Sequence, residues 1–243
     1  GAVILWLISI INRQKPLKND NLKRTIIAGI FLGFHFALFF GSIKLTTVAN
    51  ATFLGTLAPV FTFFFEKYIL KRNHANSLVW GLGLAILGVF IIIGNKFNFS
   101  SNYTIGNLIA ILCSFCLGLA FIISENVRKK VGTIAYSRTL FLTASITLFF
   151  IAQIMQIELL SFTKYEFIGL LILGIIPTLL GHGAMYHAIK YISPTVVASA
   201  PMGEPIIASL FAWFLFNELV GLFTIIGGFI ILLGLIILIN KTN

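Results

Sequence analysis

Three ionisable side chains, His35, His182 and Glu204, fall near the middle of long apolar runs. Counting from the run ends at about 1.5 Å per helical residue places them close to the centre of a membrane-spanning helix. Ionisable groups at that depth are costly, so they tend to face an aqueous cavity or a partner and to mark a pathway. Pro201 and Pro205 bracket Glu204. The pattern therefore predicts a kinked helix, with backbone carbonyls freed beside the carboxylate.

Two further side chains complete a candidate binding set. Tyr186 follows His182 by one helical turn, and Asn50 lies at the start of another apolar run. We expect His35 and His182 to approach each other, because an internal repeat described below aligns His35 with the neighbour of His182. A neutral imidazole both donates and accepts hydrogen bonds, which suits a polar substrate or a proton step. The candidate substrate-binding residues are thus His35, Asn50, His182, Tyr186 and Glu204, and the alternative for each is a structural hydrogen bond or packing between helices.

Catalytic and metal chemistry find little support in the sequence. His182 and His187 are five residues apart, which puts them about 140° apart on a helix and excludes the i,i+4 pair of a zinc site. Cys113 and Cys116 lie inside one apolar run, where packing is the expected role. With seven acidic residues and neither an H-E-x-x-H nor a G-x-S-x-G motif, we predict no enzyme, no catalytic residue, no metal and no cofactor.

The composition is that of an integral membrane protein. Hydrophobic residues make up 58% of the 243, charged residues only 10%, and the mean hydropathy is +1.02. A soluble chain carries about a quarter charged residues. Each apolar run is close to the roughly 20 residues that a spanning helix needs, and continuous apolarity excludes the alternating strands of a barrel. The eight predicted spans are 24–43, 47–70, 77–94, 104–126, 135–157, 166–189, 194–216 and 220–239.

The net charge of +10 is explained by membrane topology. The basic residues gather in alternate loops, so that 14 of the 17 Lys and Arg lie on one predicted face and Lys44, Lys96 and Lys164 on the other. The positive-inside rule makes the rich face cytoplasmic and places the carboxyl terminus there. We therefore expect a multi-pass protein of the bacterial inner membrane, which contacts the lipid bilayer and does not bind nucleic acid.

A weak internal repeat has a period of 146 residues. It relates Lys44 to Lys190, Pro59 to Pro205, Gly81 to Gly227 and Gly88 to Gly234. Residues 1–12 are apolar but too short to span, so we interpret them as the end of a truncated helix. The repeat then implies a complete protein of two five-helix units, of which about 40 residues at the amino terminus are missing from this sequence. Because each unit has an odd number of helices, the two units are expected to have opposite orientations in the membrane.

Small residues four apart predict close helix packing. They occur at Gly29 and Gly33 in one apolar run, and at Ala110, Ser114 and Gly118 in another. Glu125 and Glu218 stand at span ends and are expected at the membrane interface.

Two segments carry a family resemblance. Residues 193–220 and 47–73 resemble the fourth helices of the two repeats in EamA-type members of the drug/metabolite transporter superfamily. The most specific match is Glu204-Pro205 in mid-helix, followed by Glu218 after Asn217, where the family usually has glycine. At the corresponding end of the first half stand Lys71 and Arg72, with Glu66 earlier. The resemblance implies an all-α integral membrane protein, an inverted-repeat helical bundle whose repeats are residues 1–95 and 104–240.

The predicted function is secondary transport. We expect export or exchange of a small polar or amphipathic metabolite by alternating access, with protons as the candidate coupling ion and a homodimer as a candidate assembly. No G-x-x-x-x-G-K-[ST] loop is present, so ATP does not drive transport directly from this chain. An intramembrane enzyme and a non-transporting scaffold remain the alternatives.

Overall fold

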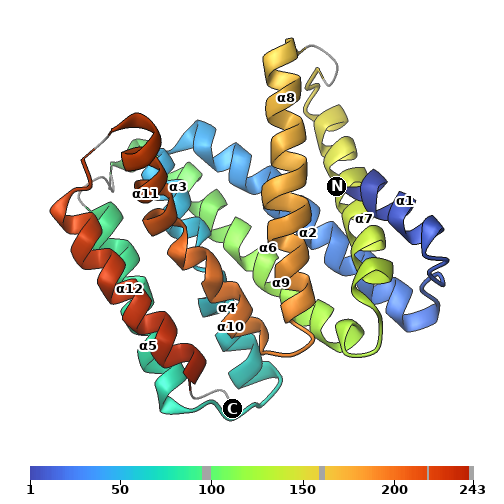
Figure 1. Cartoon of the computed structure of the whole chain (residues 1–243), viewed down its shortest axis with the longest axis horizontal. Coiled ribbons are helices and arrows are strands. Elements are labelled where there is room, and N and C mark those ends of the chain that lie inside the picture. The colour runs from blue at the N-terminus through green and yellow to red at the C-terminus, as the bar shows by residue number, and fades with distance from the viewer. Residues whose placement is uncertain (95–99, 159–161, 218, 241–243) are drawn as a thin grey trace. The chain divides into compact units, whose positions relative to one another are not determined.

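The computed structural model describes residues 1–94, 100–158, 162–217 and 219–240, and the regular elements among them are all helical (Figure 1). Glu218 and Lys96, which the sequence analysis used, lie outside the described residues. The α-helices are α1 (Ala2–Ile11), α2 (Asn19–Leu45), α3 (Val48–Gly55), α4 (Ala58–Phe64), α5 (Asn76–Ile93), α6 (Thr104–Arg128), α7 (Thr133–Ile154), α8 (Lys164–Leu173), α9 (Gly183–Ala188), α10 (Pro194–Ser199), α11 (Glu204–Phe216) and α12 (Leu222–Asn240).

Eight helices in the described residues are long and apolar enough to cross a membrane, which confirms the predicted spans. Three of them are composite: α3 and α4 continue into the π-helical turn Phe65–Ile69, α8 and α9 are joined by the π-helical segment Gly174–His182, and the 3-10 turn Ala200–Gly203 separates α10 from α11. Ala2–Ile11 is a shorter apolar helix.

The chain forms two compact units. Unit 1 comprises Gly1–Ala37 and Leu119–Ser193, and unit 2 comprises Leu38–Gly118 and Pro194–Asn243. Each unit takes chain from both predicted sequence repeats, and the division falls within the two long helices α2 and α6.

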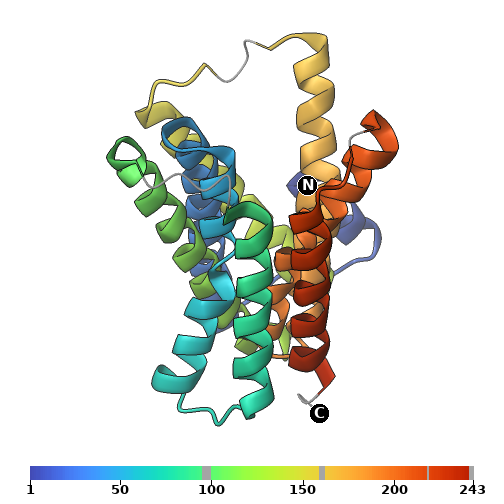
Figure 2. The ribbon, with the colours of Figure 1, turned by 90° about the vertical axis from the view of Figure 1, so that its left-hand side faces the viewer.

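In unit 2, α5 and α12 lie side by side in both views (Figures 1 and 2). A Cβ added to Gly81 would lie 2.6 Å from the carbonyl oxygen of Gly234, and one added to Gly88 would lie 2.6 Å from that of Gly227. The earlier glycine of α5 meets the later glycine of α12, so the helices are antiparallel. The absence of side chains at these four positions lets the two backbones touch, as in membrane helix pairs generally.

Small residues also permit close contacts elsewhere, as predicted. In unit 1, a Cβ on Gly29 would lie 2.6 Å from that of Thr143, and one on Gly33 would lie 2.7 Å from that of Thr147. In unit 2, Ser114 is fully buried and donates a hydrogen bond to the carbonyl of Leu54. These contacts bring α2 against α7 and α6 against α3.

Proline accounts for the interruptions of the composite helices. It lacks a donor N–H, and its ring clashes with the carbonyl four residues earlier. Pro59 follows the gap between α3 and α4, Pro177 lies inside the π-helical segment, and Pro201 lies in the 3-10 turn before Glu204 and Pro205. The kink predicted around Pro201 and Pro205 is confirmed as this 3-10 interruption.

The glycine contacts yield a stability prediction. Gly88→Ala places a methyl group against the Gly227 backbone, which cannot retract as a side chain does, so we expect a loss of about 1–3 kcal/mol. Gly83→Ala on the same helix α5 is the matched control, because nothing lies within 4 Å of its added Cβ. Thermal unfolding in detergent should show a lower Tm for Gly88→Ala alone. Equal Tm values for the two variants would contradict the close contact.

Candidate functional site

The π-helical segment of unit 1 fixes the orientation of His182. Pro177 cannot donate to the carbonyl of Leu173, and the Thr178 hydroxyl donates to that carbonyl instead, at 2.9 Å. The carbonyl of Pro177 lies 3.0 Å from His182 Nδ1. A carbonyl only accepts, so this contact places the proton on Nδ1. Neutral His182 therefore presents the lone pair of Nε2 to its surroundings.

His35, Phe36 and His182 form an aromatic cluster in unit 1. The ring centroids of His35 and His182 lie 6.0 Å apart, and the Phe36 ring lies 5.0 Å from that of His182 in an edge-on arrangement. His35 is buried, whereas His182 is half-buried. The two histidines therefore lie close together, as expected. His35 belongs to α2 and His182 to the π-helical segment. The cluster combines two titratable imidazoles with an apolar ring.

Tyr186 lies in the core of unit 1 and is fully buried. Its ring packs against Phe121, Tyr136 and Phe141, with centroids 5.3, 5.8 and 6.4 Å away. Its carbonyl accepts a hydrogen bond from Arg128 Nε at 2.8 Å. Within the described residues, the Tyr186 hydroxyl finds no hydrogen-bond partner. These contacts give its ring a packing role.

Asn50 belongs to a buried polar cluster in unit 2. Its side chain is fully buried and donates to Asn107 Oδ1 at 2.9 Å. Thr46 donates to the same oxygen at 2.7 Å. The cluster ties the segment that begins α3 to the first turns of α6.

Glu204 is the first residue of α11 in unit 2, and its side chain is exposed. A carboxylate in the first turn of a helix is stabilised by the unpaired N–H groups there. Among the described residues, no hydrogen bond or ion pair to the Glu204 carboxylate is formed.

Glu66 is the centre of a second charged cluster in unit 2. Its side chain is fully buried in the π-helical turn after α4. Oε1 accepts from Arg72 Nη1 at 2.7 Å, and Oε2 accepts from the hydroxyl of Thr195, the second residue of α10. His74 Nε2 lies 3.9 Å from Oε2. One carboxylate thus joins the end of one broken helix to the start of the other.

The backbone after Ile69 positions this pair. Lys71 adopts a left-handed conformation with φ 52°, and the Arg72 N–H donates to the Glu66 carbonyl at 2.9 Å. This bond spans six residues, one more than in a Schellman cap, and closes the end of the π-helical turn. It turns the chain back so that the Arg72 guanidinium reaches the Glu66 carboxylate.

Comparison with known proteins assigns the fold a family. Residues 1–94 and 104–240 match the EamA-like transporter family. The chain belongs to that family. It is therefore a multi-pass membrane transporter, as its eight apolar helices also indicate.

Relatives of this EamA-like transporter carry transporter names. The "Uncharacterized transporter YdfC" of Bacillus subtilis (strain 168) is 21% identical over 100% of this chain and 79% of its own length. An "Uncharacterized transporter" of Archaeoglobus fulgidus is 24% identical over 96% of this chain and 81% of its own. One crystal structure matches with a TM-score of 0.81 at 18% identity, covering 98% of this chain and 84% of that one, and shows the same fold.

The Glu66 cluster was missed by sequence reasoning about this EamA-like transporter. Glu66 was noted in the sequence only as a residue that stands earlier than the family pattern expects, and His74 was not among the candidate residues. A signal was present, because a lone carboxylate stands within an apolar run six residues before Arg72. Glu125, expected at the interface, is buried and pairs with Lys129 at 2.7 Å.

The buried amide cluster predicts a stability loss on truncation. Asn107→Ala removes an acceptor shared by Asn50 and Thr46, so we expect a cost of about 1–3 kcal/mol. The control is Asn102→Ala, because that residue precedes α6 and is exposed. Thermal unfolding of the two purified variants provides the comparison. If Asn107→Ala unfolds like Asn102→Ala, the cluster contributes nothing to stability.

Proposed function

We propose that this transporter moves a small polar or amphipathic metabolite out of the cell, or in exchange, by alternating access. The observation that carries the proposal is the pair of broken helices in unit 2, α3–α4 and α10–α11. Discontinuous spanning helices expose backbone groups and helix ends at membrane depth, where transporters bind substrates and coupling ions. Glu204 stands at such an end, unpaired among the described residues.

We further propose that the repeats 1–95 and 104–240 are inverted relative to each other. The repeat relates Gly81 to Gly227 and Gly88 to Gly234. The contacts run from Gly81 to Gly234 and from Gly88 to Gly227. Exchanging each glycine for its repeat partner converts one contact into the other, as a two-fold axis between antiparallel helices requires. This reciprocity supports the inverted arrangement.

The Glu66 cluster has a role in this mechanism as a latch between broken helices. α4 and α10 pack against each other, and the residues Pro194–Ser199 are all buried. The positive-inside rule, applied to Lys71, Arg72 and Lys190, supports a cytoplasmic position for the Glu66 end of these helices. Opening that face separates α10 from the turn that carries Glu66. The Thr195–Glu66 hydrogen bond must then break.

Some of the remaining candidate residues are proposed to contact the substrate, and others are proposed to be structural. Glu204 in unit 2 and the His35–His182 pair in unit 1 are each proposed to contact substrate or coupling protons, because carboxylate and imidazole groups inside a membrane protein can bind both. Tyr186 in unit 1 and Asn50 in unit 2 are buried, and each is proposed to hold the helices of its own unit in place. Uptake into proteoliposomes, screened with amino acids, nucleosides and amphipathic amines, tests the function. Flux of none of these classes in either direction would argue for the scaffold alternative.

A transport prediction follows for Glu204. Glu204→Gln keeps the shape of the side chain but removes its ability to ionise, so we expect flux that is lost or no longer responds to an imposed pH gradient. Glu158→Gln, the same change at an exposed residue outside the described helices, is the control. Flux is measured in proteoliposomes, with Tm as the check on folding. Wild-type flux and pH response in Glu204→Gln would reduce this carboxylate to a structural role.

A second prediction concerns the latch. Glu66→Gln replaces the carboxylate that accepts from Thr195 by a neutral amide and so weakens the hydrogen bond between α10 and the turn after α4. The proposed cytoplasmic face should then open more often, on the order of tenfold. The reporter is Ser199→Cys on α10, buried in the closed arrangement, in a background with Cys113→Ala and Cys116→Ala. The measured quantity is the rate of labelling by a membrane-impermeant maleimide in inside-out vesicles.

Glu125→Gln is the matched control for the latch, because it removes a comparable buried carboxylate paired with Lys129 in unit 1. Faster labelling of Ser199→Cys only with Glu66→Gln supports the latch. The same labelling rate in both backgrounds is incompatible with it.

A further inference from the structure

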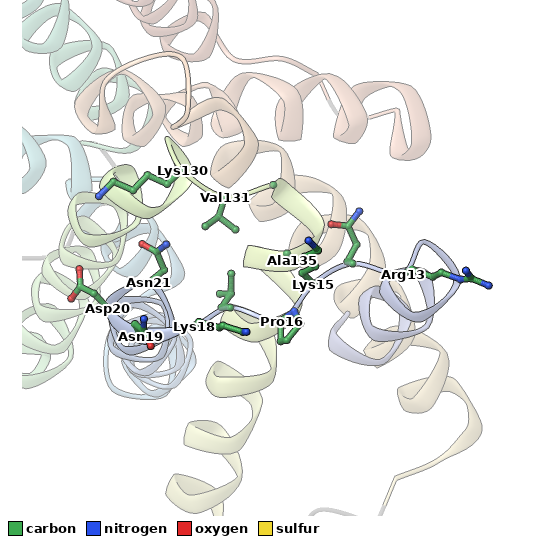
Figure 3. A pocket seen from close by; sticks show the side chains of 13 residues that line it. Arg13, Lys15, Pro16, Lys18, Asn19, Asp20, Asn21, Lys130, Val131 and Ala135 are labelled. Atoms are coloured by element: carbon green, nitrogen blue, oxygen red, sulfur yellow. The ribbon is translucent and has the colours of Figure 1, made fainter.

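A hollow of about 840 Å³ opens in unit 1 between two short connections (Figure 3). One wall is the segment that joins α1 to α2, and the other is the turn between α6 and α7. Lys15 and Lys18 lie near the middle of the hollow, and Arg13 and Lys130 lie at its opposite edges (Figure 3). This hollow belongs to neither the histidine cluster nor the broken helices.

The charges around the hollow are unbalanced. Within the described residues, none of its four cationic side chains forms an ion pair. Its one carboxylate, Asp20, is paired with Arg24 at 2.6 Å. Among the other cations that the structure describes, Arg72 pairs with Glu66 and Lys129 with Glu125. The lining of the hollow therefore carries an excess of positive charge, which favours an anionic ligand.

Buried arginines hold both walls in place. Arg138 is buried in α7 over the ring of Trp6, and it donates to Ser9 and to the carbonyl of Lys15, the latter at 3.1 Å. Arg128 is buried at the end of α6 and donates to the carbonyl of Val131 and, at 2.6 Å, to Thr133 Oγ1. Each guanidinium binds the backbone of one wall. The hollow is thus preformed, which lowers the ordering cost of binding.

The lining is also partly apolar. Leu17 and Ala135 are buried in it, and Pro16 and Val131 complete the apolar part. On the proposed topology the hollow lies at the cytoplasmic surface of the membrane, where phosphate groups meet hydrocarbon. We propose that the hollow binds a phosphate-bearing anion, the chemistry shared by an anionic lipid headgroup and a soluble phosphate ester.

The test measures binding and does not depend on transport. The whole chain is held in phosphatidylcholine nanodiscs, and native mass spectrometry follows added dioctanoyl phosphatidylglycerol in one arm and inorganic phosphate in the other. The combined variant Lys15→Gln, Lys18→Gln and Lys130→Gln removes three exposed cations from the hollow. Given the electrostatic contribution of each surface lysine, we expect phosphatidylglycerol binding to weaken by roughly tenfold or more.

The matched control is Lys23→Gln, Lys71→Gln and Lys190→Gln, which removes the same charge from the same proposed face outside the hollow. Phosphatidylglycerol binding that is lost only in the first variant supports the site with lipid as its source. Phosphate binding that depends on the same three lysines, without lipid binding, supports it with a soluble source. Equal binding by both triple variants, or no binding of either probe to the unaltered chain, overturns the proposal.

Discussion

Every backbone N–H and carbonyl inside hydrocarbon needs a partner, and the interruptions of this fold exist only where side chains provide one. At Pro177 the Thr178 hydroxyl takes the carbonyl of Leu173, and the His182 ring takes the carbonyl of Pro177. Near Pro59 the Thr62 hydroxyl donates to the carbonyls of Ala58 and Pro59, at 3.3 and 3.0 Å. At Pro177 the hydroxyl of Thr178 thus replaces the N–H that the proline lacks, and near Pro59 the hydroxyl of Thr62 adds hydrogen bonds to neighbouring carbonyls.

The need for hydrogen-bond partners away from water also separates the buried ionisable groups from the exposed ones. Glu66, Arg128 and Arg138 are buried, and each bonds to at least two other groups, as a charge removed from water demands. Glu204 differs from them because it is exposed at a helix start. A buried and saturated charge fixes the geometry of the elements it joins. The Glu204 carboxylate has no such bonds within the described residues, so it does not fix the position of α11 in this way.

The features predicted from sequence depend on patterns along the chain, and the missed ones depend on contacts between distant segments. The length of the apolar runs predicted the eight spans, and Pro201 and Pro205 predicted an interruption at Glu204. The 146-residue repeat predicted that His35 lies near His182. The Glu66–Thr195 contact joins residues 129 positions apart, and it depends on how α4 meets α10. The burial of Tyr186 among three aromatic rings likewise depends on packing that its own helix does not reveal.

The two kinds of helix contact in unit 2 differ in how easily they change. The α5–α12 contact places backbone against backbone at two glycine pairs, so any sliding creates steric overlap. The α4–α10 contact joins halves of helices that are already broken. Bending at such a break leaves the two hydrogen-bonded halves intact, because no intact ladder crosses it. Rearrangement of α4 against α10 therefore costs chiefly side-chain contacts, of which the buried Glu66 carboxylate makes the strongest.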